Sequence, residues 1–371
     1  MSGTSLDGVD AVLVAFGPEG LPFQLFGHHY QPFTAQLRET LLALNSPGSD
    51  ELHRAALASN ELARIYAAAT SALLTACGQG WESVMALGAH GQTVRHRPGE
   101  FDGLGYTLQL LNGALLAELS GIDVICDFRS RDVAAGGQGA PLVPAFHRAL
   151  FGGSGSERAI LNIGGIANLT VLSASGGVGG FDCGPGNVLM DLWCNRYLGQ
   201  PFDRDGSWAA QGKVIPKLLQ TMLDDEFVRR SPPKSTGRDH FNAPLLDGIL
   251  SRARDAARPY SPQDVQATLA EFTARSAATA LMAVSPNLKE LLVSGGGALN
   301  GNLMNRLSLA LPTCDVQSTE AANVNPMHVE ASAFAWLAYA FLARQPGNIP
   351  AVTGACGFRP LGVWHRATND R

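Results

Sequence analysis

One aspartate stands where a carboxylate could serve as a catalytic base. Asp182 lies in the segment GFDCGPGNVLMD (180–191), at the end of an expected strand and directly before a Cys-Gly-Pro-Gly turn. Phosphoryl transfer to an alcohol needs a base near the nucleophilic oxygen, and otherwise depends on positioning and on charge neutralisation by a metal ion. An aspartate here could equally cap the helix expected from about Asn187. The spacing leaves both roles open, while Asn187 and Asp191, four residues apart on one helical face, are interpreted as capping or solvated residues.

Three glycine turns could bind phosphate or a nucleotide. They lie in MSGTSLDGVD (1–10), NIGGIANLT (162–170) and VSGGGALN (293–300). Phosphate binding needs convergent backbone N–H groups with no Cβ in the way, and a strand that runs through glycines into a helix also presents a helix N-terminus. Each turn could instead be an ordinary one that needs positive φ. The sequence has no GxxxxGK[ST], no early GxGxxG that opens a helix and no GxSxG, which argues against P-loop, dinucleotide-binding and α/β-hydrolase folds.

Hydrophobic spacing indicates the elements that must position these residues. Two hairpins are expected, at 10–16 with 24–32 and at 157–165 with 167–173. The other expected elements are strands at 84–88, 105–110, 122–126 and 289–297 and helices at about 50–77, 208–224, 261–284 and 328–344. Both halves therefore open with a glycine-turned hairpin and continue into strand–helix alternation, which predicts an α/β fold of two related lobes. The polar loop 128–144 suggests a boundary, with 1–135 as the first lobe and 136–371 as the second.

Composition excludes several classes of protein. A chain of 371 residues favours two domains, and a net charge of −5 gives no indication of nucleic-acid binding. The six cysteines include no CxxC pair, which argues against a zinc site or a disulfide framework. The sequence shows no secretory leader and no apolar run of membrane-spanning length. These features predict a cytoplasmic protein with no metal held by the chain itself.

The longer motifs resemble one bacterial enzyme family, the 1,6-anhydro-N-acetylmuramic acid kinases. In chain order they are MSGTSLDGVD, GAHGQTVRH (88–96), DFRSRDVAAGGQGAPLVP (127–144), LNIGGIANLT (161–170), GFDCGPGNVLMD, KSTGRDHFN (234–242), SGGGALN (294–300) and FAWLA (334–338). The resemblance spans almost the whole chain. It implies a two-lobed actin-like (ribonuclease H-like) ATPase fold, each lobe a mixed sheet flanked by helices, with the active site in the interlobe cleft. The terminal helix could pack back on the first lobe.

The resemblance also implies which residues bind ATP. The first phosphate loop would comprise Gly3, Thr4, Ser5, Leu6, Asp7, Gly8, Val9 and Asp10. Gly164, Gly165 and Asn168 would form the second phosphate loop, and Gly295, Gly296, Gly297 and Asn300 would contact the adenosine. Mg²⁺ would bridge the phosphates, held largely by ATP and water.

The family's reaction opens the anhydro ring with water and phosphorylates O6 with ATP, giving N-acetylmuramate 6-phosphate. Carried over to this chain, Asp182 would deprotonate the water that attacks the anomeric carbon, and the released O6 would take the γ-phosphate. Arg129 and Arg131 would hold the lactyl carboxylate, because a guanidinium pairs well with a carboxylate. His90, Gln92 and Glu330 complete the predicted sugar-binding residues. Solvated arginines, a structural histidine and an ordinary first-turn glutamate are the alternatives, and the loop 234–238 could cover the cleft.

The chain departs from the family pattern at three places. Family members have a few residues before MSGTS, so we expect upstream residues that anchor the first loop and raise ATP affinity; equal affinity with and without them would contradict this. Leu111-Asn112-Gly113 stands where Gly-Asn-Pro is usual. Cys183, beside the candidate base, is expected to be a packed, non-catalytic thiol.

Two other functions remain open at this stage. The chain could be a kinase or ATPase of the same superfamily with a different small substrate, or a nucleotide-binding regulator without one. The retained Asp182 and the arginines favour the sugar kinase. A homodimer and hinge closure on binding are expected only from the family.

Overall fold

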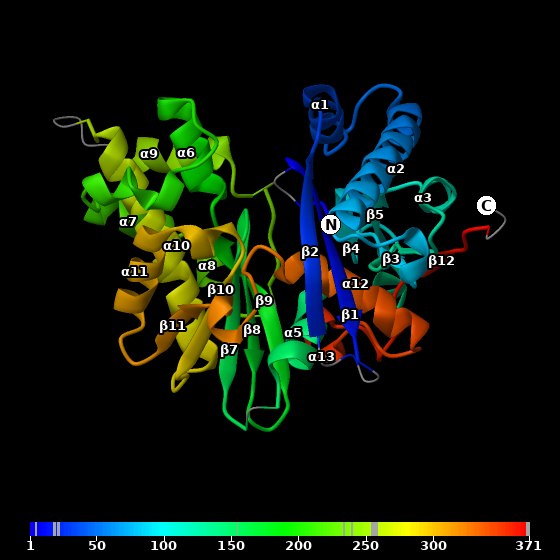
Figure 1. Ribbon diagram of the computed structural model, residues 1–371. Coiled ribbons are helices and arrows are strands. Elements are labelled where there is room, and N and C mark those ends of the chain that lie inside the picture. The colour runs from blue at the N-terminus through cyan, green and yellow to red at the C-terminus, as the bar shows by residue number, and fades with distance from the viewer. Residues whose placement is uncertain are drawn as a thin grey trace. The chain divides into compact units, whose positions relative to one another are not determined.

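The computed structural model describes residues 1–3, 6–17, 20, 23–153, 155–232, 234–238, 240–253 and 259–368 (Figure 1). The chain forms two compact units, one made of Met1–Phe151 and Glu330–Arg371 and the other of Gly152–Val329. The first unit thus continues past the boundary expected at 135, and the end of the chain belongs to it. Both units are α/β, as predicted, with sheets flanked by helices.

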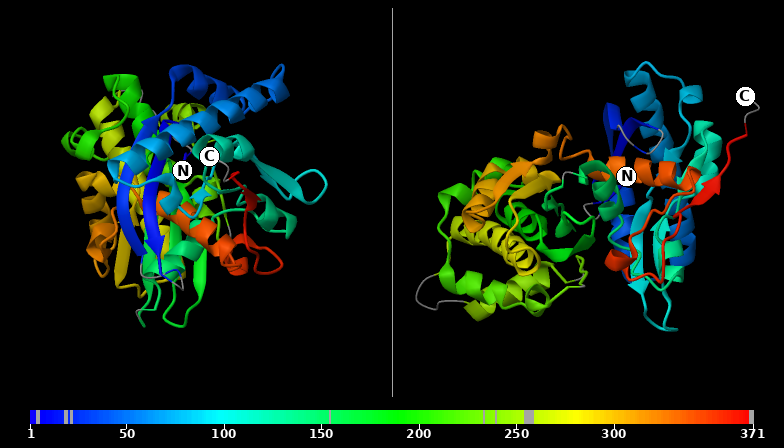
Figure 2. Two further views of the ribbon diagram at one scale, coloured as in Figure 1. Left: turned by 45° about the vertical axis from the view of Figure 1, so that its right-hand side comes forward. Right: turned by 90° about the horizontal axis from the view of Figure 1, so that it is seen from below.

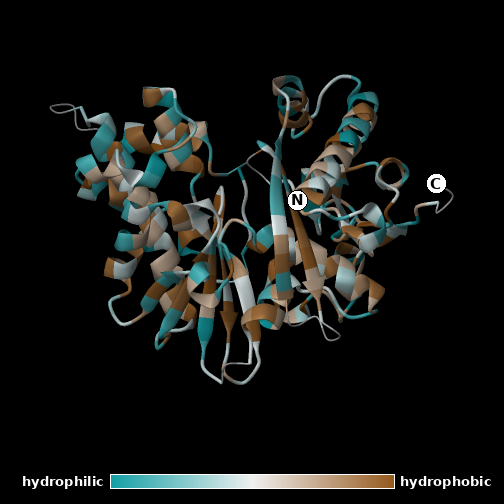
Figure 3. Cartoon of the chain, in the orientation of Figure 1, coloured by the Kyte–Doolittle hydropathy of each residue, from teal (hydrophilic) through white to brown (hydrophobic). Residues whose placement is uncertain are grey.

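The first unit opens with the predicted hairpin. β1 (Gly8–Phe16) pairs antiparallel with β2 (Phe23–Pro32), and Gly8 lies opposite Pro32. A Cβ on Gly8 would stand 2.5 Å from the carbonyl oxygen of Gln31, so the close approach of the strands requires glycine there. Helix α2 (Glu51–Ala76) packs on both strands (Figure 2). It buries Leu62, Tyr66 and Leu73 among other residues, and apolar and polar residues alternate along it (Figure 3).

Two further sheets complete the first unit. β4 (Gln92–Pro98) and β5 (Gly105–Leu110) form an antiparallel hairpin, of which the sequence indicated only the second strand. β6 (Val124–Cys126) lies between the parallel β3 (Leu87–Gly88) and the antiparallel β12 (Val363–His365). The helices are α1 (Ala35–Ala43), η1 (Trp81–Ser83), α3 (Gly113–Ser120), α4 (Ser130–Ala134), α5 (Val143–Phe151), α12 (Val329–Leu342) and α13 (Pro350–Thr353).

The second unit is built on one mixed sheet of order β11-β10-β7-β8-β9. Its strands are β7 (Arg158–Ile163), β8 (Ile166–Leu172), β9 (Val178–Pro185), β10 (Glu290–Ser294) and β11 (Asp315–Ser318). The β7–β8–β9 meander is antiparallel, whereas β10 runs parallel to β7 and β11. The predicted hairpin at 157–173 therefore forms, and β9 continues past Asp182 to Pro185 instead of ending there.

Helix α10 (Pro262–Val284) is the central helix of the second unit. Ser261 caps it by accepting a hydrogen bond from the backbone N–H of Asp264 (3.1 Å), and Pro262 occupies the first turn. Its inner residues, which include Leu269 and Phe272, pack on β8 and β9 in the main core. The other helices are α6 (Val188–Leu198), η2 (Arg204–Gly206), η3 (Ala209–Gln211), α7 (Pro216–Leu223), α8 (Glu226–Arg229), α9 (Ala243–Ala253), η4 (Gly296–Leu299), α11 (Gly301–Ala310) and η5 (Thr319–Ala322).

Candidate functional site

The first predicted phosphate loop leads into β1. Met1 and Asp10 pair through two backbone hydrogen bonds of 2.7 and 2.8 Å. The buried Ser2 hydroxyl donates to the carbonyl oxygen of Gly91 (2.8 Å). Gly3, Leu6, Asp7, Gly8 and Val9 lie between these anchors, while Thr4 and Ser5 fall outside the described residues. The loop is thus held on one side by Met1 and Ser2 and on the other by β1.

His90 and Gln92 follow β3 and contact this loop. The Nδ1 of His90 lies 3.0 Å from the Ser2 carbonyl oxygen, and the Nε2 of His90 accepts hydrogen bonds from Arg129 at 3.1 and 3.2 Å. Burial, and after it the Arg129 charge, holds the pKa of His90 well below its usual value. His90 is therefore neutral, with its proton on Nδ1. The Nε2 of Gln92 donates to the carbonyl oxygen of Gly3 (3.1 Å), whereas the buried Oε1 of Gln92 has no partner among the described residues.

Glu330 lies in the first turn of α12, near the same loop. The carboxylates of Glu330 and Asp10 both act on the buried Met1 amino group, whose pKa burial lowers to about 6. Three of the predicted sugar-binding residues, His90, Gln92 and Glu330, therefore lie close to the first loop. Arg129 joins them through His90 and also donates to the carbonyl oxygen of Gly139 (2.8 Å).

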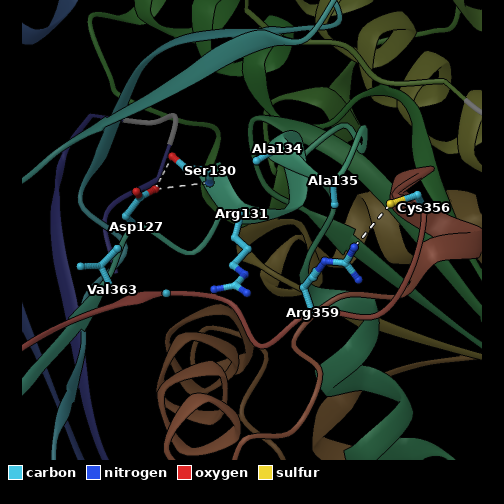
Figure 4. Close-up of a pocket in the computed structure, with 9 residues that line it drawn as sticks. Asp127, Ser130, Arg131, Ala134, Ala135, Cys356, Arg359 and Val363 are labelled. Atoms are coloured by element: carbon cyan, nitrogen blue, oxygen red, sulfur yellow. Dashed lines mark hydrogen bonds between the residues drawn. The ribbon is translucent and has the colours of Figure 1, made fainter.

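Arg131 lies apart from this cluster. Arg129 is the N-cap residue of α4 and Arg131 the second residue of that helix, and side chains two positions apart on a helix point to different sides. Arg131 lines a pocket of the first unit together with Arg359, as Figure 4 shows. The structure thus separates the two arginines that the sequence grouped together.

In the second unit, a row of polar side chains crosses the sheet. Ser294 on β10 pairs with Asn162 on β7, Asn162 with Asn168 on β8, and Asn168 with Asp182 on β9. Residues directly opposite one another in neighbouring strands point to the same face. The Ser294 hydroxyl and the Asn162 Oδ1 lie 3.4 Å apart, consistent with this arrangement. The row connects the glycines after β10, the β7–β8 turn and the candidate base, and sequence reasoning missed Asn162 and Ser294.

Asp182 is braced by the loop 234–238. Its backbone N–H donates to the carbonyl oxygen of Lys234 (3.1 Å). The Oδ2 of its carboxylate accepts hydrogen bonds from the Ser235 hydroxyl and from the Thr236 backbone N–H, both at 2.9 Å. The loop therefore orients this carboxylate, whereas its covering of a cleft stays a prediction. Asp182 lies within a strand and before a turn, so the alternative that it caps a helix is wrong.

Lys234 anchors that loop. It is 7% exposed, and its Nζ donates to the carbonyl oxygens of Phe227 (3.1 Å) and Val228 (3.0 Å). Burial lowers its pKa. No sequence motif marks this role, because its partners are carbonyl groups that any residue carries.

The two glycine turns of the second unit differ in their contacts. The carbonyl oxygens of Gly164 and Gly165 accept hydrogen bonds from the backbone N–H groups of Gly186, Asn187 and Val188. Gly295 has φ of +77°, and a Cβ there would stand 2.6 Å from the Asn162 Oδ1, so glycine is required. Gly296 and Gly297 begin η4, and Asn300 caps α11 by accepting from the Leu303 backbone N–H (3.0 Å). The predicted strand–glycine–helix order of the adenosine loop is therefore present.

Cys183, Asn187 and Asp191 follow Asp182 in sequence, and each was interpreted as non-catalytic. Cys183 is fully buried, and burial raises the pKa of its thiol, which agrees with a packed thiol. Burial also raises the pKa of Asp191 to about 7, against the lowering effect of Arg238. Asp191 is half-buried, so it is only partly solvated. The Asn187 side chain donates to the carbonyl oxygen of Ile163 (3.2 Å) and makes no cap to α6.

These features are those expected of a kinase: two α/β units, glycine turns at strand ends and a carboxylate held in place by hydrogen bonds. Residues 1–367 match the family model described as anhydro-N-acetylmuramic acid kinase. Proteins of that name from Variovorax paradoxus and Bordetella petrii are 55% and 56% identical to this chain, each over 99% of it and over 98% and 95% of the relative. The one from Cupriavidus pinatubonensis is 54% identical over 98% of this chain and 96% of its own. The chain belongs to the anhydro-N-acetylmuramic acid kinase family.

A solved structure also shows a weak similarity. The ROK hexokinase from Thermus thermophilus is 15% identical, covering 84% of this chain and 93% of its own, with a TM-score of 0.30. That similarity is too low to define fold or function.

Proposed function

We propose that this protein uses ATP to open 1,6-anhydro-N-acetylmuramic acid with water and to phosphorylate its O6, giving N-acetylmuramate 6-phosphate for cell-wall recycling. Family membership supports the substrate and the nucleotide. The observation that carries the mechanism is the polar row Ser294–Asn162–Asn168–Asp182, which leads from the proposed adenosine loop past the second phosphate loop to a braced carboxylate. A cytoplasmic location and a homodimer are part of the same proposal.

Asp182 is the proposed base. Two hydrogen bonds to its Oδ2 fix the orientation of the carboxylate, which is thus positioned to take a proton from water. As the water attacks the anomeric carbon and gives its proton to Asp182, the bond from that carbon to O6 breaks. O6 then bonds to the γ-phosphorus of ATP while the bond from that phosphorus to the bridging oxygen breaks and ADP leaves. One proton acceptor therefore serves ring opening and phosphoryl transfer together.

The proposed sugar-binding residues have distinct tasks. The neutral His90 accepts from Arg129 and so fixes the guanidinium. The Oε1 of Gln92, which has no partner among the described residues, suits a hydroxyl or amide donor of the sugar. Arg129 and Arg131 are the proposed cations for the acid group, and Glu330 a proposed hydrogen-bond acceptor.

Nucleotide and metal are proposed to bind at the glycine turns. In the described part of the chain, no group of three or more His, Cys, Asp and Glu side chains forms a metal cage. The oxygen donors Asp7 and Asp10 suit a hydrated Mg²⁺ carried by ATP. When bound, Mg²⁺ would neutralise phosphate charge. The described residues include no helix long and apolar enough to cross a membrane.

The test is ADP release from ATP with and without 1,6-anhydro-N-acetylmuramic acid. We expect sugar-dependent release in the native chain, its abolition in Asp182→Asn with nucleotide binding retained, and normal release in the exposed control Asp224→Asn. No sugar-dependent release by the native chain would refute the proposed function. Loss of nucleotide binding together with turnover in Asp182→Asn would assign Asp182 a structural role.

A further inference from the structure

A tight turn of the second unit holds one end of the proposed adenosine loop. The turn is η2 (Arg204–Gly206), and the loop runs from Gly295 to Asn300, after which α11 begins. The Oδ1 of Asp205 accepts a hydrogen bond of 2.8 Å from the backbone N–H of Gly301, the first residue of α11. Asp205 and Gly301 are 96 positions apart in the chain, so no local sequence pattern indicates this contact.

Asp205 and Asn300 together cap the start of α11. The first backbone N–H groups of a helix have no partner within the helix. Asp205 accepts from the N–H of Gly301, and the Oδ1 of Asn300 accepts from the N–H of Leu303 (3.0 Å). A negative charge is also favourable at this end of a helix dipole. Asp205 therefore fixes the residue directly after Asn300, which is the last of the predicted adenosine contacts.

The turn lies directly against the start of α11. Gly206 has φ of +65°, and a Cβ on it would stand 2.6 Å from the Cβ of Asn302 and closer still to the Asn300 Oδ1, so this approach requires glycine. Asp205 has φ of +56°, a left-handed conformation that is unfavourable for a residue with a side chain. An aspartate kept in such a conformation indicates a role that glycine could not fill.

Buried contacts fasten the turn to the helices of the second unit. Asp203 is 8% exposed, and its two carboxylate oxygens accept hydrogen bonds from the backbone N–H groups of Trp208 and Ala209, both at 2.9 Å. The Nε2 of Gln266 on α10 lies 3.5 Å from the Oδ2 of Asp203. Helix α10 also packs on α11 (Figure 1). The turn is therefore held by the same helix that supports α11.

The other end of the adenosine loop is fixed by the sheet. Gly295 follows β10, and its backbone N–H donates to the carbonyl oxygen of Pro326 (2.9 Å). Gly297 lies against β7, where a Cβ on it would stand 2.5 Å from the Cβ of Ile163. The loop is thus held at both ends, and Asp205 contributes the contact at the helix end.

From these contacts we propose that Asp205 is a positioning residue for the nucleotide. It acts through Gly301 and Asn300, because the position of the α11 start sets the position of the adenosine contact. This rests on the proposed function, which assigns the adenosine to the loop from Gly295 to Asn300. The role also accounts for an unfavourable backbone conformation at Asp205, since only a side chain can accept from the Gly301 N–H.

The experiment replaces Asp205 by glycine and by asparagine. Asp205→Gly removes the acceptor but also relieves the left-handed strain, so nucleotide affinity should fall without a loss of stability. We expect KM for ATP and Kd for the non-hydrolysable analogue AMP-PNP to rise about 5- to 10-fold, a loss typical of a missing helix cap. The values of kcat, KM for the sugar and Tm should not change. Asp205→Asn keeps an oxygen acceptor and tolerates positive φ, so its Kd should stay within about twofold of the native value.

Asp50→Gly is the matched control for this substitution. Asp50 is also an exposed aspartate with a left-handed backbone (φ +49°), and it is the N-cap residue of α2. Its side chain makes no cap hydrogen bond. Asp50→Gly should therefore bind AMP-PNP as the native chain does.

Three results would overturn the positioning role while the proposed kinase function stands: an unchanged Kd in Asp205→Gly, an equal loss in Asp205→Asn, or the same loss in Asp50→Gly. A Tm that falls together with nucleotide affinity would make Asp205 a residue of general stability and would also overturn the role. A native chain that does not bind AMP-PNP would refute both this inference and the nucleotide site of the proposed function.

Discussion

Removal of one hydroxyl tests whether the loop 234–238 orients the proposed base. In Ser235→Ala, Asp182 loses the 2.9 Å hydrogen bond from the Ser235 hydroxyl but keeps the bond from the Thr236 backbone N–H. A hydrogen bond to a charged group contributes about 1.5–3 kcal/mol, and the lower value applies because Ser235 is exposed. About 1.5 kcal/mol corresponds to roughly a tenfold loss of kcat. KM for ATP should not change.

The assay is steady-state ADP release, measured for kcat and KM. Ser235→Thr keeps a hydroxyl and should recover most of the activity. Ser308→Ala, an exposed serine on α11, controls for the substitution itself. A kcat for Ser235→Ala within twofold of the native value, or an equal loss in Ser235→Thr, would refute an orienting role.

Two further predictions concern the second unit and the cysteines. Because burial raises the pKa of Asp191 from 3.8 to about 7, the native state holds a proton that the unfolded chain has released, and stability falls as pH rises through that window. The Asp191→Asn variant should therefore be more stable than the native protein by a margin that grows from pH 4 to pH 7 and is constant above pH 7. Thermal melts measure this margin, and a margin that does not depend on pH would contradict the prediction. Iodoacetamide near pH 8 should label the exposed Cys356 and not the buried Cys183 in the native protein, and peptide mass spectrometry showing labelled Cys183 before unfolding would disprove its burial.

Local sequence patterns are sufficient to predict those helices and hairpins whose structure depends on neighbouring residues. Hydrophobic spacing over about 261–284 predicts α10, and the glycine turns predict the hairpins β1–β2 and β7–β8. The strand and turn singled out Asp182 but left its role as base or cap open, and only the family resemblance favoured the base. Asp182 and its brace Ser235 are separated by 53 residues, however, and no local pattern pairs a serine with a distant aspartate.

Contacts between residues far apart in sequence account for the other differences between the sequence predictions and the structure. Arg129 and Arg131 look equivalent in FRSRD, but helix geometry sends them to different partners, His90 and the pocket with Arg359. The partial burial of Asp191, which raises the pKa of its carboxyl, depends on the packing of other segments around α6 and is not visible in the local sequence. Sequence order placed residues 136–371 in the second lobe and left open whether the terminal helix packs on the first. Asn348 and Thr353 contact Asp132 in the first unit.

The divided first unit affects how the protein is made. The second unit is one continuous stretch, so a growing chain can complete its five-stranded sheet before α12 is synthesised. The first unit cannot close at that stage. Gly88 packs against the Phe334 backbone, β6 pairs with β12, and Asp132 accepts hydrogen bonds from Asn348 and Thr353. All of these contacts need residues that are synthesised last. Ribosome-bound chains that stop before residue 330 should therefore expose apolar surface of the N-terminal segment, which makes this half the part that depends on chaperones during synthesis.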